Sequence, residues 1–319
     1  DKIGDERGKI LAIRDFVAKN IRETPPGLHA AGLDALTTAD RTLSDGYGNS
    51  PDRAILLKTM LDALGVKSHF VVISNRADTP ENRVAAVATP DTGAFDTVRV
   101  ATMGYLLGGS DQYTPLEAAP GEGMLMLNPA RGSIGVVTPL APTRENTEVT
   151  IDLKPNGDAD IRVITRYYGL AAGAVNRQFS EFTPEERRRY EVELRQRLAE
   201  NAVKTGDLSF RLDERGVATL AYGALIPNLA PRSGTFRQLE LPAFGAFAAA
   251  VSTADRDRET PYLRTGRVET GYRWHITAPA DWRVASLPPG FKTQLPLESV
   301  ELKSAVAGNR ITVSVSLEL

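Results

Sequence analysis

The first third of the chain has hydrophobic positions at helical spacing. Apolar residues near the N-terminus recur at intervals of three and four, which predicts an amphipathic helix. They are Ile10, Ile13, Phe16, Val17 and Ile21. Residues 54–64 are apolar on most sides and stop at Gly65, which favours a helix end, so a buried helix over about 51–64 is expected. The apolar run 68–73 predicts a strand.

From about residue 143 the hydrophobic period changes to two. Apolar and polar residues alternate over 147–153 and again over 161–167, and the Asn-Gly pair between them is typical of a hairpin turn. A helical segment over about 169–203 follows, in which Thr183 and Glu186 have the spacing of a capping box. Further strands are expected over 208–212, 217–222, 235–241, 272–277, 282–287 and 310–319.

These patterns predict an α+β chain with two domains. Residues 1–142 combine helices and strands, whereas residues 143–319 are typical of an antiparallel β-sandwich or paired sheets with the helical segment inserted. The length of 319 residues is sufficient for two or three domains.

Composition excludes several classes of function. A net charge of −2 and a pI near 6.1 provide no electrostatic attraction for nucleic acid or for an anionic membrane. No apolar stretch approaches the roughly 18 residues that a membrane helix needs, so no transmembrane segment is expected. The absence of cysteine excludes disulfides and thiolate metal sites. With no phosphate-binding loop and no metal-ligand spacing among the three histidines, neither a cofactor nor a metal is expected.

One octet carries the candidate chemistry, Tyr47-Gly48-Asn49-Ser50-Pro51-Asp52-Arg53-Ala54. It resembles the active-site segment of bacterial transglutaminase-like proteins, which reads roughly Tyr-Gly-Asp-Cys-Lys-Asp-Lys-Ala. Ser50 stands where that family keeps its nucleophilic cysteine. The resemblance extends over roughly residues 5–135 and implies a transglutaminase-like, papain-like core.

The resemblance also places the two other catalytic positions of the family. Its Phe-Asn-His-Val corresponds to residues 95–98, so Thr97 stands at the histidine. Its Leu-Asp-Pro-Thr corresponds to residues 127–130, so Asn128 stands at the acid that orients the histidine. A leucine-proline-glycine stretch over 287–296 is similar to the C-terminal β domain of the same family.

All three positions depart from the family pattern. Asparagine can orient a base, but a threonine hydroxyl cannot accept a proton at neutral pH, so Ser50 has no activating base. The combination with Thr97 and Asn128 implies a degenerate, inactive triad. A deliberate Cys→Ser substitution made to trap a substrate would explain Ser50, but it would not explain Thr97 or Asn128. Each residue also has a structural reading: Ser50 as a helix N-cap before Pro51, Thr97 in a strand and Asn128 in a turn.

The expected function is therefore a pseudoenzyme that acts as a binding or scaffold module. Its partner is expected to be another protein or an extended peptide. Gly48, Asn49, Ser50 and Asp52 are the expected ligand-binding residues, because a helix N-terminus attracts anions. The alternatives are a hydrolase or acyltransferase that uses Ser50 with another base or the carboxylates Asp52 and Asp96, and a purely architectural module.

The resemblance further implies a bacterial envelope protein. Members of the family are typically exported, so a periplasmic or extracellular location within a longer protein is expected, with the cytoplasm as the alternative. The sequence also assigns structural roles to two histidines. His69 lies in an apolar strand, and His275 is expected on the solvated face of its strand.

Overall fold

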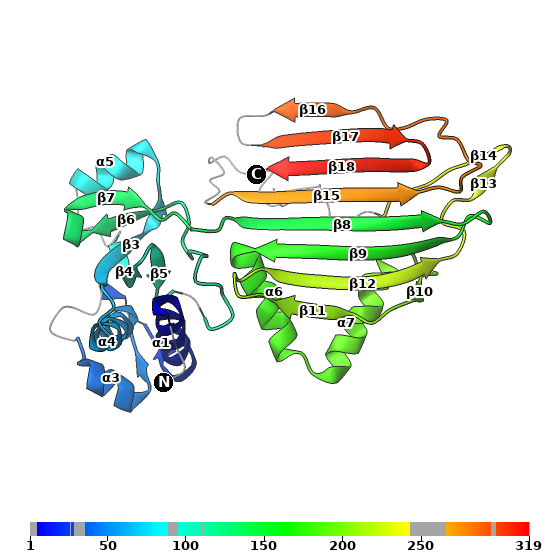
Figure 1. Ribbon diagram of the computed structural model, residues 1–319. Coiled ribbons are helices and arrows are strands. Elements are labelled where there is room, and N and C mark those ends of the chain that lie inside the picture. Colours follow the sequence, from blue (N-terminus) through cyan, green and yellow to red (C-terminus); the bar gives the residue numbers. More distant parts are fainter. Residues whose placement is uncertain are drawn as a thin grey trace. The chain divides into compact units, whose positions relative to one another are not determined.

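Figure 1 shows the computed structural model, which describes residues 5–25, 27–28, 36–88, 95–109, 111–242, 266–294 and 298–318. The chain divides into two compact units that meet in the sequence between Pro142 and Thr143. The second unit continues from Thr143, apart from a short stretch ending at Gly266 that belongs to the first. Both units combine helices with sheets, which confirms the mixed α+β class.

The first unit contains helices at its start and a sheet that follows them. Its helices are α1 (Glu6–Asn20), α3 (Ala39–Asp45), α4 (Ser50–Ala63) and α5 (Pro80–Ala88), with a 3₁₀ turn η2 (Pro129–Arg131). Its strands are β1 (Arg22–Glu23), β2 (Tyr47–Gly48), β3 (His69–Ala77), β4 (Phe95–Thr102), β5 (Tyr105–Leu107), β6 (Met124–Asn128) and β7 (Ser133–Val136).

The sheet of the first unit has the order β5-β4-β3-β6-β7, and each neighbouring pair is antiparallel. Its two faces have separate cores. One core joins α1 and α4 to the sheet and includes Ile10, Leu57, Val98 and Val100. The other contains Val71, Ile73, Ala119 and Val137. Side chains alternate between the two faces along a strand. Val98 and Val100 of β4 therefore face α4, whereas Val71 and Ile73 of β3 face away from it.

The second unit is dominated by strands. They are β8 (Thr143–Leu153), β9 (Ala159–Tyr168), β10 (Val203–Lys204), β11 (Ser209–Leu212), β12 (Ala218–Ile226), β13 (Arg232–Ser233), β14 (Phe236–Arg237), β15 (Val268–Thr277), β16 (Phe291–Gln294), β17 (Ser299–Ala307) and β18 (Arg310–Glu318). Two helices, α6 (Gly169–Glu181) and α7 (Pro184–Gln196), lie between β9 and β10.

The predicted β-sandwich is wrong, because the long strands form one sheet. Its order is β10-β12-β9-β8-β15-β18-β17-β16, with β11 also paired to β12 (Figure 1). The sheet is mixed, because β8 and β15 at its centre are parallel while the other pairs are antiparallel. Helices supply the second layer in place of a second sheet, since Phe179, Leu194 and Leu198 share one core with the strands.

Local predictions in this unit agree best with the structure. The hairpin is β8–β9, in which Ile151 lies opposite Ile161. The capping box at Thr183 and Glu186 is present, and it starts α7. The helical segment is two helices that end at Gln196, not one stretch to 203. Residues 282–287 form no strand, and only 236–237 of the expected strand 235–241 are extended in a ladder.

Among the described residues, none of the helices is both long enough and apolar enough to cross a membrane.

Candidate functional site

The N-terminus of α4 is closed by its own side chains. Asn49, and not Ser50 as predicted, is the N-cap, because its Oδ1 accepts the Asp52 N–H at 3.0 Å. The Asp52 carboxylate in return accepts the Asn49 N–H at 3.2 Å, which completes a capping box. Ser50 and Pro51 are thus the first two helical residues. Both Asn49 and Ser50 are good caps, so the sequence alone did not distinguish between them.

Ser50 contacts the edge of strand β4. Its Oγ accepts a hydrogen bond from the Val98 N–H at 3.3 Å, and the side chain is almost fully buried. Strand β5 ends at Leu107, opposite Val100, so among the described residues β4 has no strand partner at Val98 on that side. The Val98 carbonyl there accepts a hydrogen bond from Arg99 Nη1 at 3.2 Å. Ser50 and Arg99 therefore replace the hydrogen bonds that a longer β5 would make.

Thr97 and Asn128 lie on the other face of the sheet. Thr97 is opposite Ile73 and Ile73 is opposite Met126, and paired residues point their side chains the same way. Asn128 follows Met126 by two positions and shares that face. Strand β3 separates the two strands that carry Thr97 and Asn128, a distance of about 10 Å at ordinary strand spacing. In the described part of the chain, Ser50, Thr97 and Asn128 make no hydrogen bond to one another.

The structure instead brings Asn128 together with His69. The Asn128 Nδ2 and His69 Nε2 atoms are 3.2 Å apart, between strands β6 and β3. The Asn128 Oδ1 atom is buried and has no partner among the described residues. Ser133 lies opposite Asn128 on β7, on the side away from β3. Asn128 therefore lies between His69 and Ser133. In a catalytic triad the histidine lies between the nucleophile and the orienting residue, so these three residues do not have the order of a triad. His275 is exposed, as expected, and His29 lies outside the described residues.

The residues expected to bind a ligand are used internally. The Asp52 carboxylate accepts the Thr37 N–H at 2.8 Å in addition to the Asn49 N–H. A Cβ on Gly48 would come within 2.8 Å of the Asp52 Cβ, so glycine is required by close packing there. The Arg53 N–H donates to the Asn49 carbonyl. An anion at this helix end would therefore compete with the Asp52 carboxylate for the Asn49 N–H and with the Asn49 side chain for the Asp52 N–H.

A charged cluster that the sequence did not reveal lies beside this site. Arg53, from the first turn of α4, pairs with Glu23 of β1, and the Nη1 atom of Arg99 lies 3.9 Å from the same carboxylate. Burial lowers the pKa of Arg99, and Glu23 opposes that shift. The Arg99 side chain passes over Gly109, where a Cβ would come within 2.6 Å of its Nε. The Glu23 carboxylate of β1 is thus linked to α4 through Arg53 and to β4 through Arg99.

Within the described residues, no group of three His, Cys, Asp or Glu side chains is arranged to hold a metal ion. Asp96, the second carboxylate considered for acid–base chemistry, lies where the β3–β4 register shifts. It packs so closely against Gly27 that a Cβ there would clash with its carboxylate. Asp52 and Asp96 thus both have packing roles in the structure.

Comparison with known proteins identifies no family. No family model matches the chain, and no curated protein matches it. Among solved structures the chain is similar to the crystal structure of "a putative protease" from Parabacteroides distasonis ATCC 8503. The identity is 15% and the TM-score is 0.47, over 100% of this chain and 47% of the other. The chain therefore spans about half the length of that protein.

Proposed function

We propose that this chain is a non-catalytic binding or scaffold module of the bacterial envelope, built on a degenerate transglutaminase-like core. The observation that supports this best is the hydrogen bond from the Val98 amide to Ser50 Oγ. A nucleophilic serine needs a base that takes its proton and an open approach for the substrate carbonyl. Ser50 contacts a strand amide instead, and only 6% of its surface is exposed.

Thr97 and Asn128 are not placed to act together with Ser50. Their strand positions point them to the face that carries Ile73, whereas α4 packs on the face that carries Val98. Ser50 therefore contributes to strand pairing, and Thr97 and Asn128 lie within the sheet, so the three positions do not form a triad. These positions favour a unit that provides a stable fold and a binding surface over one that catalyses acyl transfer.

The contact with a partner is proposed to involve the second unit. The large sheet ends at β16, where each of the four residues is exposed. A strand at the edge of a sheet has unpaired N–H and C=O groups, and an extended peptide can add to them as a further strand. Near-neutral net charge favours recognition by such local hydrogen bonding over long-range attraction.

An activity assay tests the non-catalytic part of the proposal. The chain and its Ser50→Ala variant are incubated with amide, peptide and glutamine acyl donors between about pH 5 and 9, a range that spans histidine titration. No turnover above the background reaction is expected from either protein. Turnover that is present in the chain and absent from Ser50→Ala would favour a hydrolase or acyltransferase instead.

A capture experiment tests the edge of the sheet. Thr293→Pro removes an amide from β16 and disturbs its edge, whereas Thr293→Ala keeps the backbone intact. We expect the whole chain and Thr293→Ala to capture the same partner from an envelope extract, and Thr293→Pro to lose it. Equal capture by all three proteins would place the contact away from this edge.

A further inference from the structure

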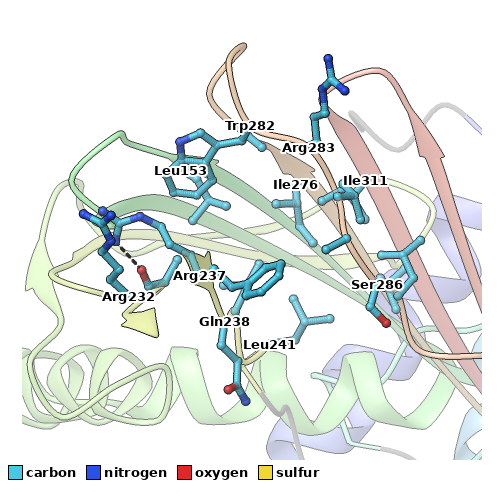
Figure 2. Close-up of a pocket in the computed structure, with 18 of the residues that line it drawn as sticks. Leu153, Arg232, Arg237, Gln238, Leu241, Ile276, Trp282, Arg283, Ser286 and Ile311 are labelled. Carbon is cyan, nitrogen blue, oxygen red and sulfur yellow. Dashed lines mark hydrogen bonds between the residues drawn. The ribbon is translucent and has the colours of Figure 1, made fainter. Parts of the chain in front are cut away.

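A cavity of about 850 Å³ lies within the second unit, on the apolar face of its sheet (Figure 2). Its floor comes from three neighbouring strands and consists of Leu153, Ile276, Ile311 and Val313. Its walls are the segment 230–241, which contains the β13–β14 pair, and the irregular segment 281–288. The volume lies within the range of pockets that hold small organic molecules.

The cavity follows from the shape of the unit. Helix α6 packs against β8, β9 and β12, which is one half of the apolar face. Strand register continues that face onto β15 and β18, because Ile151 is opposite Ile276, and Ile276 is opposite Ile311. The floor of the cavity is therefore a continuation of the sheet's core, beyond the strands that α6 contacts.

One end of the cavity carries excess positive charge. Arg232 and Arg237 lie directly opposite each other in the β13–β14 pair, and like charges in that position repel. Arg237 donates to the carbonyls of Ala230 and Pro155 at 2.8 and 3.0 Å and lies over the Trp282 ring. Arg232 Nε donates to the Gly234 carbonyl at 3.0 Å. Neither arginine makes an ion pair in the described part of the chain.

The other charged residues in the described lining do not balance this pair. Among the described residues that line the cavity, Asp281 is the one carboxylate and Arg283 is a third arginine. Figure 2 shows the side chain of Arg283 directed away from the other lining side chains. The charged end is thus formed by Arg232 and Arg237, next to an apolar floor.

We propose that this cavity binds a single-chain amphipathic anion of the fatty carboxylate class. The alkyl chain lies along the floor of Ile276 and Ile311, where it is removed from water. The carboxylate lies at Arg232 and Arg237, whose guanidinium groups retain N–H donors beyond those used by backbone carbonyls. Its charge relieves the repulsion between the two arginines. The proposal does not depend on the role of Ser50.

Binding of dodecanoate to the whole chain tests the proposal, with 1-dodecanol as the neutral probe of equal chain length. The chain has two tryptophans, and Trp282 lines the cavity whereas Trp274 is buried in the sheet. Saturable binding of dodecanoate with a change in tryptophan fluorescence is expected, and calorimetry should give one site per chain. Dodecanol is expected to bind at least about tenfold more weakly, because it lacks the charged hydrogen bonds.

Variants locate the site. Arg232→Gln and Arg237→Gln are each expected to weaken dodecanoate binding by about ten- to a hundredfold and to leave dodecanol binding within about twofold. Arg283→Gln is the matched control, since it removes the same charge from a side chain directed away from the cavity, and about twofold or less is expected. Arg237 also donates hydrogen bonds to two backbone carbonyls, so Arg232→Gln is the variant that disturbs the local structure less. Circular dichroism tests whether each variant is folded.

Three results would overturn the proposal. The first is no binding of dodecanoate by the folded chain. The second is equal binding of dodecanoate and dodecanol, which would mean that the cavity binds the alkyl chain and does not recognise the carboxylate. The third is an equal loss of binding in Arg283→Gln and Arg232→Gln, which would indicate attraction by overall charge. These variants leave Ser50 unchanged, so this test fails or succeeds separately from the proposed function.

Discussion

Ser50 has a structural role at the level of the single residue, because its hydroxyl satisfies a strand amide that β5 leaves unpaired. We expect Ser50→Ala to lower the free energy of unfolding by about 1–3 kcal/mol, since a buried N–H loses its partner. Urea denaturation measures the change. Ser133→Ala, at an exposed position on β7, is the control and should change stability by less than about 0.5 kcal/mol. Equal effects would argue against this role for Ser50.

Glu145 provides a prediction about pH. Burial raises the pKa of this carboxyl on β8, opposite Tyr167. A raised pKa in the folded state means that the native protein binds the proton more tightly than the unfolded chain, so stability falls as pH rises through this range. Glu145→Gln should therefore be little different from the parent chain near pH 3.5 and increasingly more stable above about pH 5.

Denaturation of both proteins at several pH values measures this difference. Glu148→Gln, on the opposite face of the same strand, removes a charge from a side chain that pairs with Arg166. This control should not reproduce the gain in stability. A difference between Glu145→Gln and the parent chain that is constant from pH 3.5 to 8 would contradict the role of burial.

At the level of elements, α7 depends on its capping box. Thr183 Oγ1 accepts the Glu186 N–H at 3.2 Å, and Glu186 Oε2 accepts the Thr183 N–H at 2.8 Å. Thr183→Ala should therefore lower the free energy of unfolding by about 1 kcal/mol, while Thr183→Ser should be close to neutral. Thermal denaturation of the two variants provides the measurement. A loss as large for serine as for alanine would mean that packing, not the cap, supports this helix end.

We expect packing of the helices on the sheet to stabilise the same unit more than the cap does. Phe179 of α6 stacks on Phe210 of β11 with ring centroids 4.5 Å apart, and it belongs to the core that includes Leu194. Phe179→Ala is expected to cost about 3–5 kcal/mol, several times the cost of the missing cap. If urea denaturation gives similar losses for both substitutions, the helices do not form the second layer of this core.

At the level of the whole molecule, each unit has its own buried core, so the two should be separable in function. Residues 143–319 are predicted to be essential to capture of the partner, because they contain the exposed edge strand β16. Capture by the whole chain and by residues 1–142 alone, from the same extract, measures this. Equal recovery by residues 1–142 would place the contact in the first unit.

Several features were predictable because they depend on neighbours in the sequence. Alternation of apolar residues and an Asn-Gly turn predicted the β8–β9 hairpin, and Thr183 with Glu186 predicted the start of α7. Such signals depend on backbone geometry over a few residues. The same local reading could not choose between Asn49 and Ser50 as the cap of α4, because either residue has suitable chemistry.

Only the tertiary structure decided which residues meet across the chain. A strand with one apolar face packs equally well on a second sheet or on helices, so the sequence alone did not distinguish a sandwich from one sheet covered by α6 and α7. The pair Asn128 and His69 and the opposed arginines Arg232 and Arg237 likewise arise from strand register. Register is set by the packing of whole elements, and a shift of one residue would move each side chain to the other face.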